Sequence, residues 1–195
     1  IGPTTGAGGG GGTFIVKGTE PWSSTPENVI IVAGGGGGAH AEESGQRHGG
    51  DALFNPVNWD TSGGAGSEWH VGGGGGFLSD GAAAIPTHNA SPSTVFYGRS
   101  FKRTEFMSKG GGSVYDSNNS PGWPDGGFGG GGAGDRTAGG GGGGYNGGDA
   151  GYASSNPSGK GGGSRIQTTH YNIGTNLTST LGNYSEHGKV IITKL

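Results

Sequence analysis

Seven runs of consecutive glycines divide this chain, and no other feature restricts its fold as strongly. A long glycine run does not belong in an α-helix, because each glycine costs about 1 kcal/mol relative to alanine there. Segments with tryptophan, phenylalanine, tyrosine and β-branched residues separate the runs, and a flexible glycine linker has no use for such residues. The runs cover residues 8–12, 34–38, 72–76, 110–112, 129–132, 139–144 and 161–163.

An ordered glycine run favours the polyglycine-II conformation, an extended helix with three residues per turn and a rise of about 3.1 Å per residue. This helix has no internal hydrogen bonds, so its amides need partners on neighbouring segments. Because glycine has no side chain, several backbones pack at contact distance and exchange hydrogen bonds in three directions. The predicted fold class is therefore a glycine-rich bundle of polyglycine-II helices with a few β-strands and almost no α-helix. We predict one helix at each of Gly8, Gly36, Gly74, Gly111, Gly130, Gly141 and Gly162.

Aliphatic residues are too few to form the large apolar core of a conventional domain. Leu, Ile, Val and Phe together number 29 of 195 residues, whereas glycine alone numbers 53 and proline 9. This composition excludes a helix bundle, a Rossmann domain and a TIM barrel, and leaves a disordered low-complexity chain as the alternative. The sequence predicts one glycine-rich domain over residues 1–195, with strands at 13–16, 29–33 and 189–193.

Ordered glycine runs also predict how substitutions act, whichever function is right. Where neighbouring backbones touch a glycine, an added methyl group pushes a segment outward and stretches several hydrogen bonds. We therefore expect alanine at Gly36 or Gly141, which lie inside runs, to lower stability by roughly a few kcal/mol. At Gly50 or Gly98, which lie in connections, we expect the same change to be nearly neutral unless the glycine needs a positive φ angle.

The charge and hydropathy of the chain do not favour binding to nucleic acid or insertion into a membrane. The formal net charge is −3, and the 11 Lys and Arg residues are scattered along the chain rather than clustered. The longest apolar run, residues 29–33, has the length of a strand and is too short to cross a bilayer. We expect no nucleic-acid partner and no membrane insertion. The chain has no cysteine and hence no disulfide or thiolate metal site.

No pattern of side chains predicts catalysis, a cofactor or a metal. The six histidines lie in separate segments, without an HExxH or GxSxG motif near them. Residues 116–120 look like the start of a calcium loop, but Pro121 stands where the turn glycine is needed and Gly127 where the bidentate glutamate is needed. Matches to GxGxxG follow from the abundance of glycine alone. The sequence predicts a protein that is not an enzyme and binds no cofactor or metal.

Aromatic residues in the connections are the best functional lead in the sequence. They either cap the ends of the glycine segments or contact a partner. Residues 97–103 mix cations with aromatics, which suits a protein interface as well as a solvated loop. The candidate interface residues are Trp22, Trp59, Trp69, Trp123, Arg99, Phe101 and Arg103. Among the Asn-x-Ser/Thr sites, Asn176 and Asn183 are the predicted glycosylation acceptors, because a proline closely follows each of the others.

Two pairs of blocks in the chain resemble a known family. Residues 6–16 with 29–39, and residues 126–132 with 139–148, are similar to blocks of the glycine-rich extracellular domain of the anaplastic lymphoma kinase and leukocyte tyrosine kinase receptors. Residues 187–192 resemble the final strand of that domain. The resemblance implies a bundle of polyglycine-II helices joined to a small β-sandwich-like part, extracellular and non-enzymatic, with a binding role in the receptors.

The chain departs from that family at two places. Residues 135–138 stand where the animal receptors carry cysteines, so we expect a cysteine-free, non-vertebrate relative. We also expect the first β-strands of the family to be missing, because few residues precede the first glycine run. With too few strands to close a sheet, unpaired strand edges favour assembly with another chain.

Two classes of function follow from these observations, with a third behind them. The first is an extracellular structural protein, a stiff bundle at the cell surface that assembles with itself into a filament or matrix. The second is a recognition module, such as a receptor ectodomain or a phage-type adhesin tip, whose partner is another protein. The third is ice binding by a flat face of the bundle. The oligomeric state discriminates between the first two.

Overall fold

In the computed structural model, the described residues contain almost no helix. Within the described part of the chain the only helix is a single 3-10 turn, η1 (Pro26–Asn28), whose first residue is a proline with a fixed φ angle. The prediction of almost no α-helix is therefore confirmed for these residues. The structure describes residues 5–17, 25–42, 45–54, 61–67, 71–82, 97–101, 110–111, 125–135, 137–152 and 156–167.

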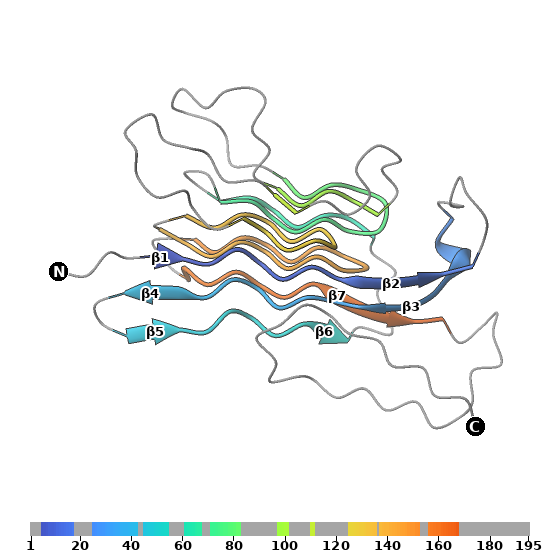
Figure 1. The fold of residues 1–195 in the computed structure, drawn as a ribbon, viewed down its shortest axis with the longest axis horizontal. Helices are drawn as coiled ribbons and strands as arrows, with labels where there is room; N and C mark the ends of the chain where they lie inside the picture. Colours follow the sequence, from blue (N-terminus) through green and yellow to red (C-terminus); the bar gives the residue numbers. More distant parts are fainter. Residues whose placement is uncertain are drawn as a thin grey trace.

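Toward one end of the molecule lies a mixed sheet of four strands in the order β2, β3, β7 and β6 (Figure 1). β2 (Thr13–Val16) and β3 (Val29–Ala33) pair antiparallel, and both are rich in residues that favour strands. β7 (Gly163–Ile166) pairs antiparallel with β3, whereas β6 (Leu53–Phe54) pairs in parallel with β7. The predicted strands 13–16 and 29–33 are confirmed, and the predicted strand 189–193 lies outside the described residues.

A smaller antiparallel sheet lies at the opposite end, and two glycine runs connect the two sheets (Figure 1). It consists of β1 (Thr5–Gly6), β4 (His40–Glu42) and β5 (Gly45–Arg47). Run 8–12 leads from β1 to β2, and run 34–38 leads from β3 to β4. Other glycine-rich segments run alongside these two between the ends of the molecule. We call this hydrogen-bonded set of segments the glycine array.

Residues 139–144 lie at the centre of the glycine array and are buried throughout. Their N–H groups donate to three neighbouring segments in rotation, so that each segment receives every third N–H group, at N···O distances of 2.7 to 3.2 Å. All three acceptor segments run parallel to the central one. In the order of the donors, the acceptors are the carbonyl oxygens of Pro157, Ala7, Gly72, Lys160, Gly10 and Gly75.

The carbonyl groups of the same central segment face three further segments, all antiparallel to it. These groups accept hydrogen bonds in the same rotation, with a repeat of three residues. For the carbonyls of residues 139–143 in order, the donors are the N–H groups of Gly151, Gly38, Gly132, Gly148 and Gly35. Residues 139–144 therefore have six hydrogen-bonded neighbours, three on the donor side and three on the acceptor side.

A second segment, residues 71–77, repeats this arrangement and is also buried along its whole length. Its N–H groups donate to segments 130–133, 79–82 and 145–148 in rotation, so that every third N–H group reaches the same neighbour. Its carbonyl groups accept from three others: segment 64–67, segment 98–101 and the central segment 139–144. Two adjacent segments are thus each surrounded by six neighbours, and the interior between the two sheets consists of backbone.

Not every predicted glycine helix is extended along its whole run. Run 129–132 begins in a turn, where Gly129 and Gly130 have φ angles of 100° and 89°. Positive φ angles of this kind are common for glycine and strained for other residues. Within run 34–38, Gly36 and Gly37 are only half-buried, so this run lies nearer the surface than the two central segments.

The space around individual glycines corrects the predictions about which positions tolerate alanine. A Cβ atom at Gly141 would overlap the carbonyl oxygen of Gly148, as expected for a packed run. At Gly36, in contrast, the nearest atom would be the carbonyl oxygen of Gly50 at 3.6 Å, an ordinary contact. The prediction that alanine at Gly36 is costly is therefore wrong, because Gly36 lies on an open side of its segment.

The two glycines assigned to connections also belong to the glycine array. A Cβ atom at Gly98 would overlap the carbonyl oxygen of Gly130, and the N–H group of Gly98 donates to Gly73. At Gly50 a Cβ atom would lie 3.0 Å from the Cα atom of Lys160, tighter than an ordinary contact. The prediction that alanine is nearly neutral is wrong at Gly98, where short segments outside the long runs complete the array; at Gly50 it stays a prediction.

Candidate interaction surface

The parallel glycine segments place an aromatic residue at the same end of the array. Phe77 follows run 72–76, Tyr145 follows run 139–144, and Phe101 ends the segment that runs parallel to residues 73–76. The rings of Phe77 and Tyr145 stack with centroids 5.9 Å apart, and those of Phe77 and Phe101 with centroids 5.4 Å apart. The result is an aromatic cluster that closes the array beneath the four-stranded sheet.

One face of the sheet packs on this aromatic cluster. Phe14 of β2 stacks on Phe101 with ring centroids 4.7 Å apart. Val29 and Val32 of β3 are buried against Phe77. Because strand side chains alternate between faces, these residues leave the other face of the sheet to a different set of side chains.

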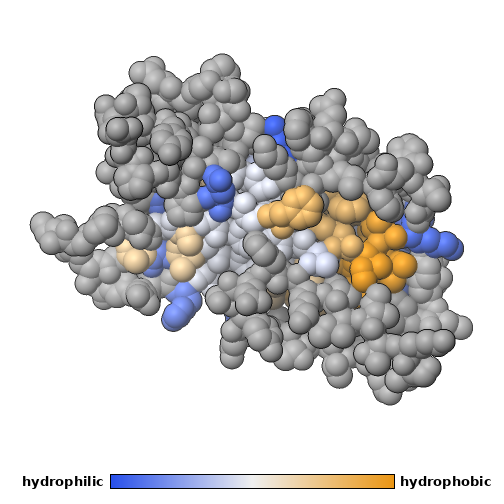
Figure 2. All heavy atoms as spheres, viewed as in Figure 1, coloured by the Kyte–Doolittle hydropathy of each residue, from blue (hydrophilic) through white to orange (hydrophobic). Residues whose placement is uncertain are grey.

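That other face carries a row of isoleucines across three strands. Ile15 of β2 pairs with Ile31 of β3, which in turn pairs with Ile166 of β7, and all three side chains are half-buried. We call these three residues the isoleucine row. Figure 2 shows hydrophobic side chains gathered at the end of the molecule where β2 and β3 lie.

Further apolar side chains are exposed beside the sheet and in one turn. Leu53 and Phe54, which form β6 at the edge of the sheet, are 56% and 37% exposed. Phe128 is 77% exposed, and it precedes the two glycines with positive φ. Hydrogen bonds hold this turn to the array, from Gly12 to Gly129 and from Gly75 to Gly130. Exposed aromatics on a fixed backbone suit contact with a protein partner.

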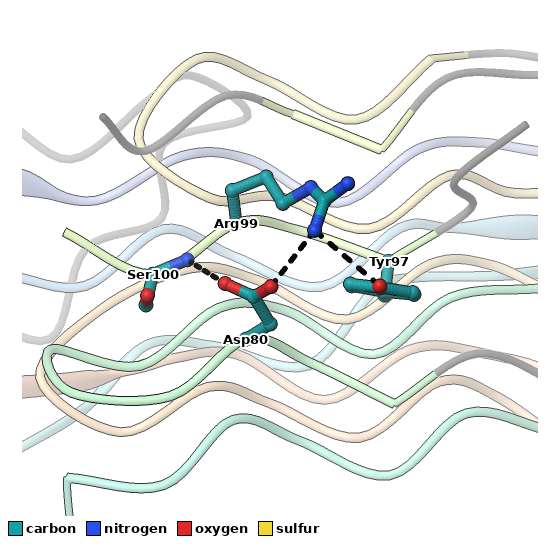
Figure 3. A network of polar contacts seen from close by, with 4 residues as sticks. All are labelled: Asp80, Tyr97, Arg99 and Ser100. Atoms are coloured by element: carbon teal, nitrogen blue, oxygen red, sulfur yellow. Dashed lines mark hydrogen bonds and ion pairs between the residues drawn. The ribbon is translucent and has the colours of Figure 1, made fainter. Parts of the chain in front are cut away.

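Two of the predicted interface residues, Arg99 and Phe101, make contacts within the chain. The Arg99 guanidinium forms an ion pair with Asp80 at 2.9 Å and lies 5.0 Å from the ring centroid of Tyr97 (Figure 3). The other carboxylate oxygen of Asp80 accepts the Ser100 N–H at 2.8 Å. Phe101 packs in the aromatic cluster. The Arg99 side chain thus joins segments 79–82 and 98–101, and the Phe101 ring joins segment 98–101 to the aromatic cluster.

The remaining predicted site residues lie outside the described part of the chain. Their roles in an interface or in glycosylation stay predictions. They are Trp22, Trp59, Trp69, Trp123, Arg103, Asn176 and Asn183.

The surroundings of two ionisable side chains, Asp149 and Arg165, shift their pKa values. Burial raises the pKa of Asp149, but the Lys160 ammonium at 2.8 Å and the Ala65 N–H outweigh it and hold this pKa below its usual value. Arg165 of β7 lies over the ring of Tyr145, with its Cζ atom 4.3 Å from the centroid. Burial lowers the pKa of Arg165, and the charge of Glu27 opposes this shift. The Asp149–Lys160 pair is therefore exposed at the rim of the array, whereas the Arg165 side chain is buried between the sheet and Tyr145.

A cluster of metal-ligating side chains and a membrane-spanning helix are both absent from the described residues. Among them, no three His, Asp or Glu side chains come together in a way that would hold a metal ion. Nor does this part of the chain contain a helix with the length and hydropathy to cross a membrane. His40 is buried, whereas His48, one residue beyond the strand partner of His40, is exposed.

Sequence reasoning missed the residues that close the array. Phe77 and Tyr145 had a usable signal, because each directly follows a long glycine run. Asp80 had none, since its partner Arg99 comes from another segment and no local pattern connects the two. Leu53 and Phe54 also lacked a signal, because two residues are too few to show strand alternation.

No protein-family model matches this chain, and no curated protein sequence matches it significantly. The assignment of a function therefore depends on the geometry above and on the motifs of the chain itself.

Proposed function

We propose that this chain is a non-catalytic extracellular structural protein, a stiff bundle of polyglycine-II helices that assembles with other copies into a surface filament or matrix. The observation that carries the proposal is the three-residue repeat of backbone hydrogen bonds around residues 139–144. Three residues per turn is the repeat of this helix, and its N–H and C=O groups point outward in three directions.

Six hydrogen-bonded neighbours make the centre of such a bundle stiff. Residues 139–144 have no side-chain rotamers to reorder, and moving the segment in any direction breaks backbone hydrogen bonds to at least one neighbour. Adding a side chain is equally restricted, as the overlap at Gly141 indicates. Stiffness of this kind favours a mechanical role over a catalytic one.

Apolar groups at the surface support assembly. The isoleucine row, Leu53 and Phe54 lie on one sheet whose two outer strands, β2 and β6, end the pairing within the described residues. Strand edges without blocking charges pair readily with another chain. We propose another copy of this chain as the principal partner, with no nucleic acid and no membrane insertion.

The location and family belong to the same proposal. Residues 126–132 and 139–148 resemble blocks of the glycine-rich receptor domain, and the extracellular or cell-surface location is taken from that resemblance. On this reading residues 1–195 form one glycine-rich domain without enzymatic activity.

A recognition module is the second candidate, and the turn at Phe128 favours it. A 77% exposed aromatic side chain on a turn held by hydrogen bonds from Gly12 and Gly75 is preorganised for insertion into a partner. In this alternative the chain binds a different protein and remains a monomer by itself.

Oligomeric state tests the proposal. Light scattering over a range of concentrations, followed by electron microscopy, should show regular polymers or defined oligomers that grow with concentration. A monodisperse monomer at every concentration would contradict the structural role and favour the recognition module.

A further inference from the structure

β2 is the outer strand of the four-stranded sheet, and half of its backbone groups face away from the sheet (Figure 1). The Lys17 N–H, one residue beyond β2, donates to the Asn28 carbonyl on the β3 side at 2.8 Å. Backbone groups along an antiparallel strand alternate between the two sides. Those of Ile15 therefore also face β3, and those of Phe14 and Val16 face outward.

The features that normally protect a strand edge are lacking in β2. It contains no proline and no charged residue. Its pairing with β3 has one irregularity, and the register places the extra residue, Ile30, in β3, so that β2 itself is regular. Among the described residues no strand pairs with the outer side of β2.

We propose that β2 pairs antiparallel with β2 of a second copy about a two-fold axis at Ile15. This contact rests on the assembly proposed above and names its site. Phe14 lies opposite Val16 of the second copy, and each of these two pairs exchanges two N–H···O=C bonds. All outward groups of Phe14 and Val16 are then used. The result is one sheet of eight strands across the two copies.

Charge and hydropathy favour this antiparallel register. It places Lys17 opposite Thr13 of the second copy, whereas a parallel arrangement in register places the two Lys17 side chains opposite each other. Like charges directly opposite are destabilising in a sheet. The two Ile15 side chains meet at the axis, so the isoleucine rows of the two copies form one continuous apolar stripe.

A single introduced cysteine tests the register, because the chain has no cysteine of its own. In the proposed pair the two residues at position 15 face each other without hydrogen bonds, with Cα atoms about 4.5 Å apart. A disulfide spans about 4.4 to 6.8 Å between Cα atoms. The Ile15→Cys variant should therefore form a covalent dimer under mild oxidation, read by non-reducing electrophoresis.

Lys17→Cys is the matched control. It lies at the more exposed end of the same strand, yet its two copies are offset by four residues along the paired strands, about 13 Å. It should cross-link much more slowly than Ile15→Cys. Circular dichroism of both reduced variants, compared with the unmodified chain, verifies that they are folded. Equal cross-linking of the two variants would overturn the proposed register.

Charge at position 13 gives a second measurement that does not depend on oxidation. Thr13→Glu places a carboxylate opposite Lys17 of the second copy and should tighten association, whereas Thr13→Lys should weaken it. Two symmetric pairs change at once, so the dissociation constants should differ by about tenfold at low salt. Sedimentation velocity provides these constants.

The outcomes separate the contact from the proposed function. If the unmodified chain assembles but neither the cysteine nor the charge variants respond as stated, the β2 contact is overturned while assembly stands. If the unmodified chain remains a monomer at every concentration, both are overturned.

Discussion

The centre of the glycine array and its sheet end are stabilised by different means. Residues 139–144 have no side chains, and their N–H and C=O groups bond to six neighbouring segments. At the sheet end, Phe77, Tyr145 and the valines of β3 exclude water in the ordinary way. Adding a side-chain atom therefore destabilises the centre, whereas removing side-chain atoms destabilises the sheet end.

The comparison explains how a chain so poor in aliphatic residues folds. Each glycine loses about 0.5 to 1 kcal/mol more backbone entropy than alanine on folding. The net contribution of one hydrogen bond to the stability of the fold is only about 1 kcal/mol. Isolated glycine segments therefore do not become ordered. The aromatic cluster adds the apolar burial that isolated glycine segments lack, and it packs at one end of the parallel segments.

We expect the largest loss of stability in the central region from the Gly141→Ala substitution. The new methyl group would overlap the Gly148 carbonyl, which accepts the Gly74 N–H, so a whole segment must move. We expect unfolding by urea to show a loss of about 4 kcal/mol. Gly36→Ala is the control, because its methyl group would meet only an oxygen at 3.6 Å, and it should change stability by less than about 1 kcal/mol. Equal effects at the two positions would mean that the glycine runs are not packed.

Truncation of Phe77 tests the sheet end. Phe77 is fully buried between Phe14, Phe101 and Tyr145, so Phe77→Ala leaves a cavity and should cost about 3 to 4 kcal/mol. The same truncation at exposed Phe128 should cost less than about 0.5 kcal/mol. Thermal unfolding of both variants checks this difference. A loss at Phe128 as large as that at Phe77 would place the apolar core elsewhere.

The smallest expected effect is at the rim, at the ion pair of Lys160 with Asp149. The folded pKa of Asp149 lies below its usual value, so the pair stabilises the fold above the unfolded pKa and loses this contribution as the pH falls below about 4. Because both side chains are exposed, Lys160→Met should cost at most about 0.5 kcal/mol at pH 7. At pH 2 the variant and the unmodified chain should be equally stable. A larger difference at pH 2 than at pH 7 would contradict this assignment.

The side chains predict the sheet end better than they predict the array. β2 and β3 follow from their β-branched and aromatic residues, and their predicted bounds are those observed. β7 could not be predicted, because Gly163–Ile166 shows no clean alternation and begins within a glycine run. Its place in the sheet follows from its pairing with β3, which no local pattern reveals.

In the array, the sequence indicates that glycine segments exist but not which ones are neighbours. Identical residues carry no information on register, so nothing local distinguishes packed Gly98 from open Gly36. The ion pair of Asp80 with Arg99 depends on the same missing neighbour relation. In the candidate site, the residue types of Arg99 and Phe101 are enough to select them as candidates, but the sequence does not predict which residues they contact.

Amide hydrogen exchange tests the central claim, that the interior is made of hydrogen-bonded backbone. The N–H groups of residues 139–144 donate to three different segments, so all six should exchange only through global unfolding. Their opening free energies should equal that of whole-chain unfolding and match those of the buried amides around Phe77. Exchange of these glycine amides within about tenfold of the rate of an unstructured glycine peptide would show that the run is a linker and contradict the account.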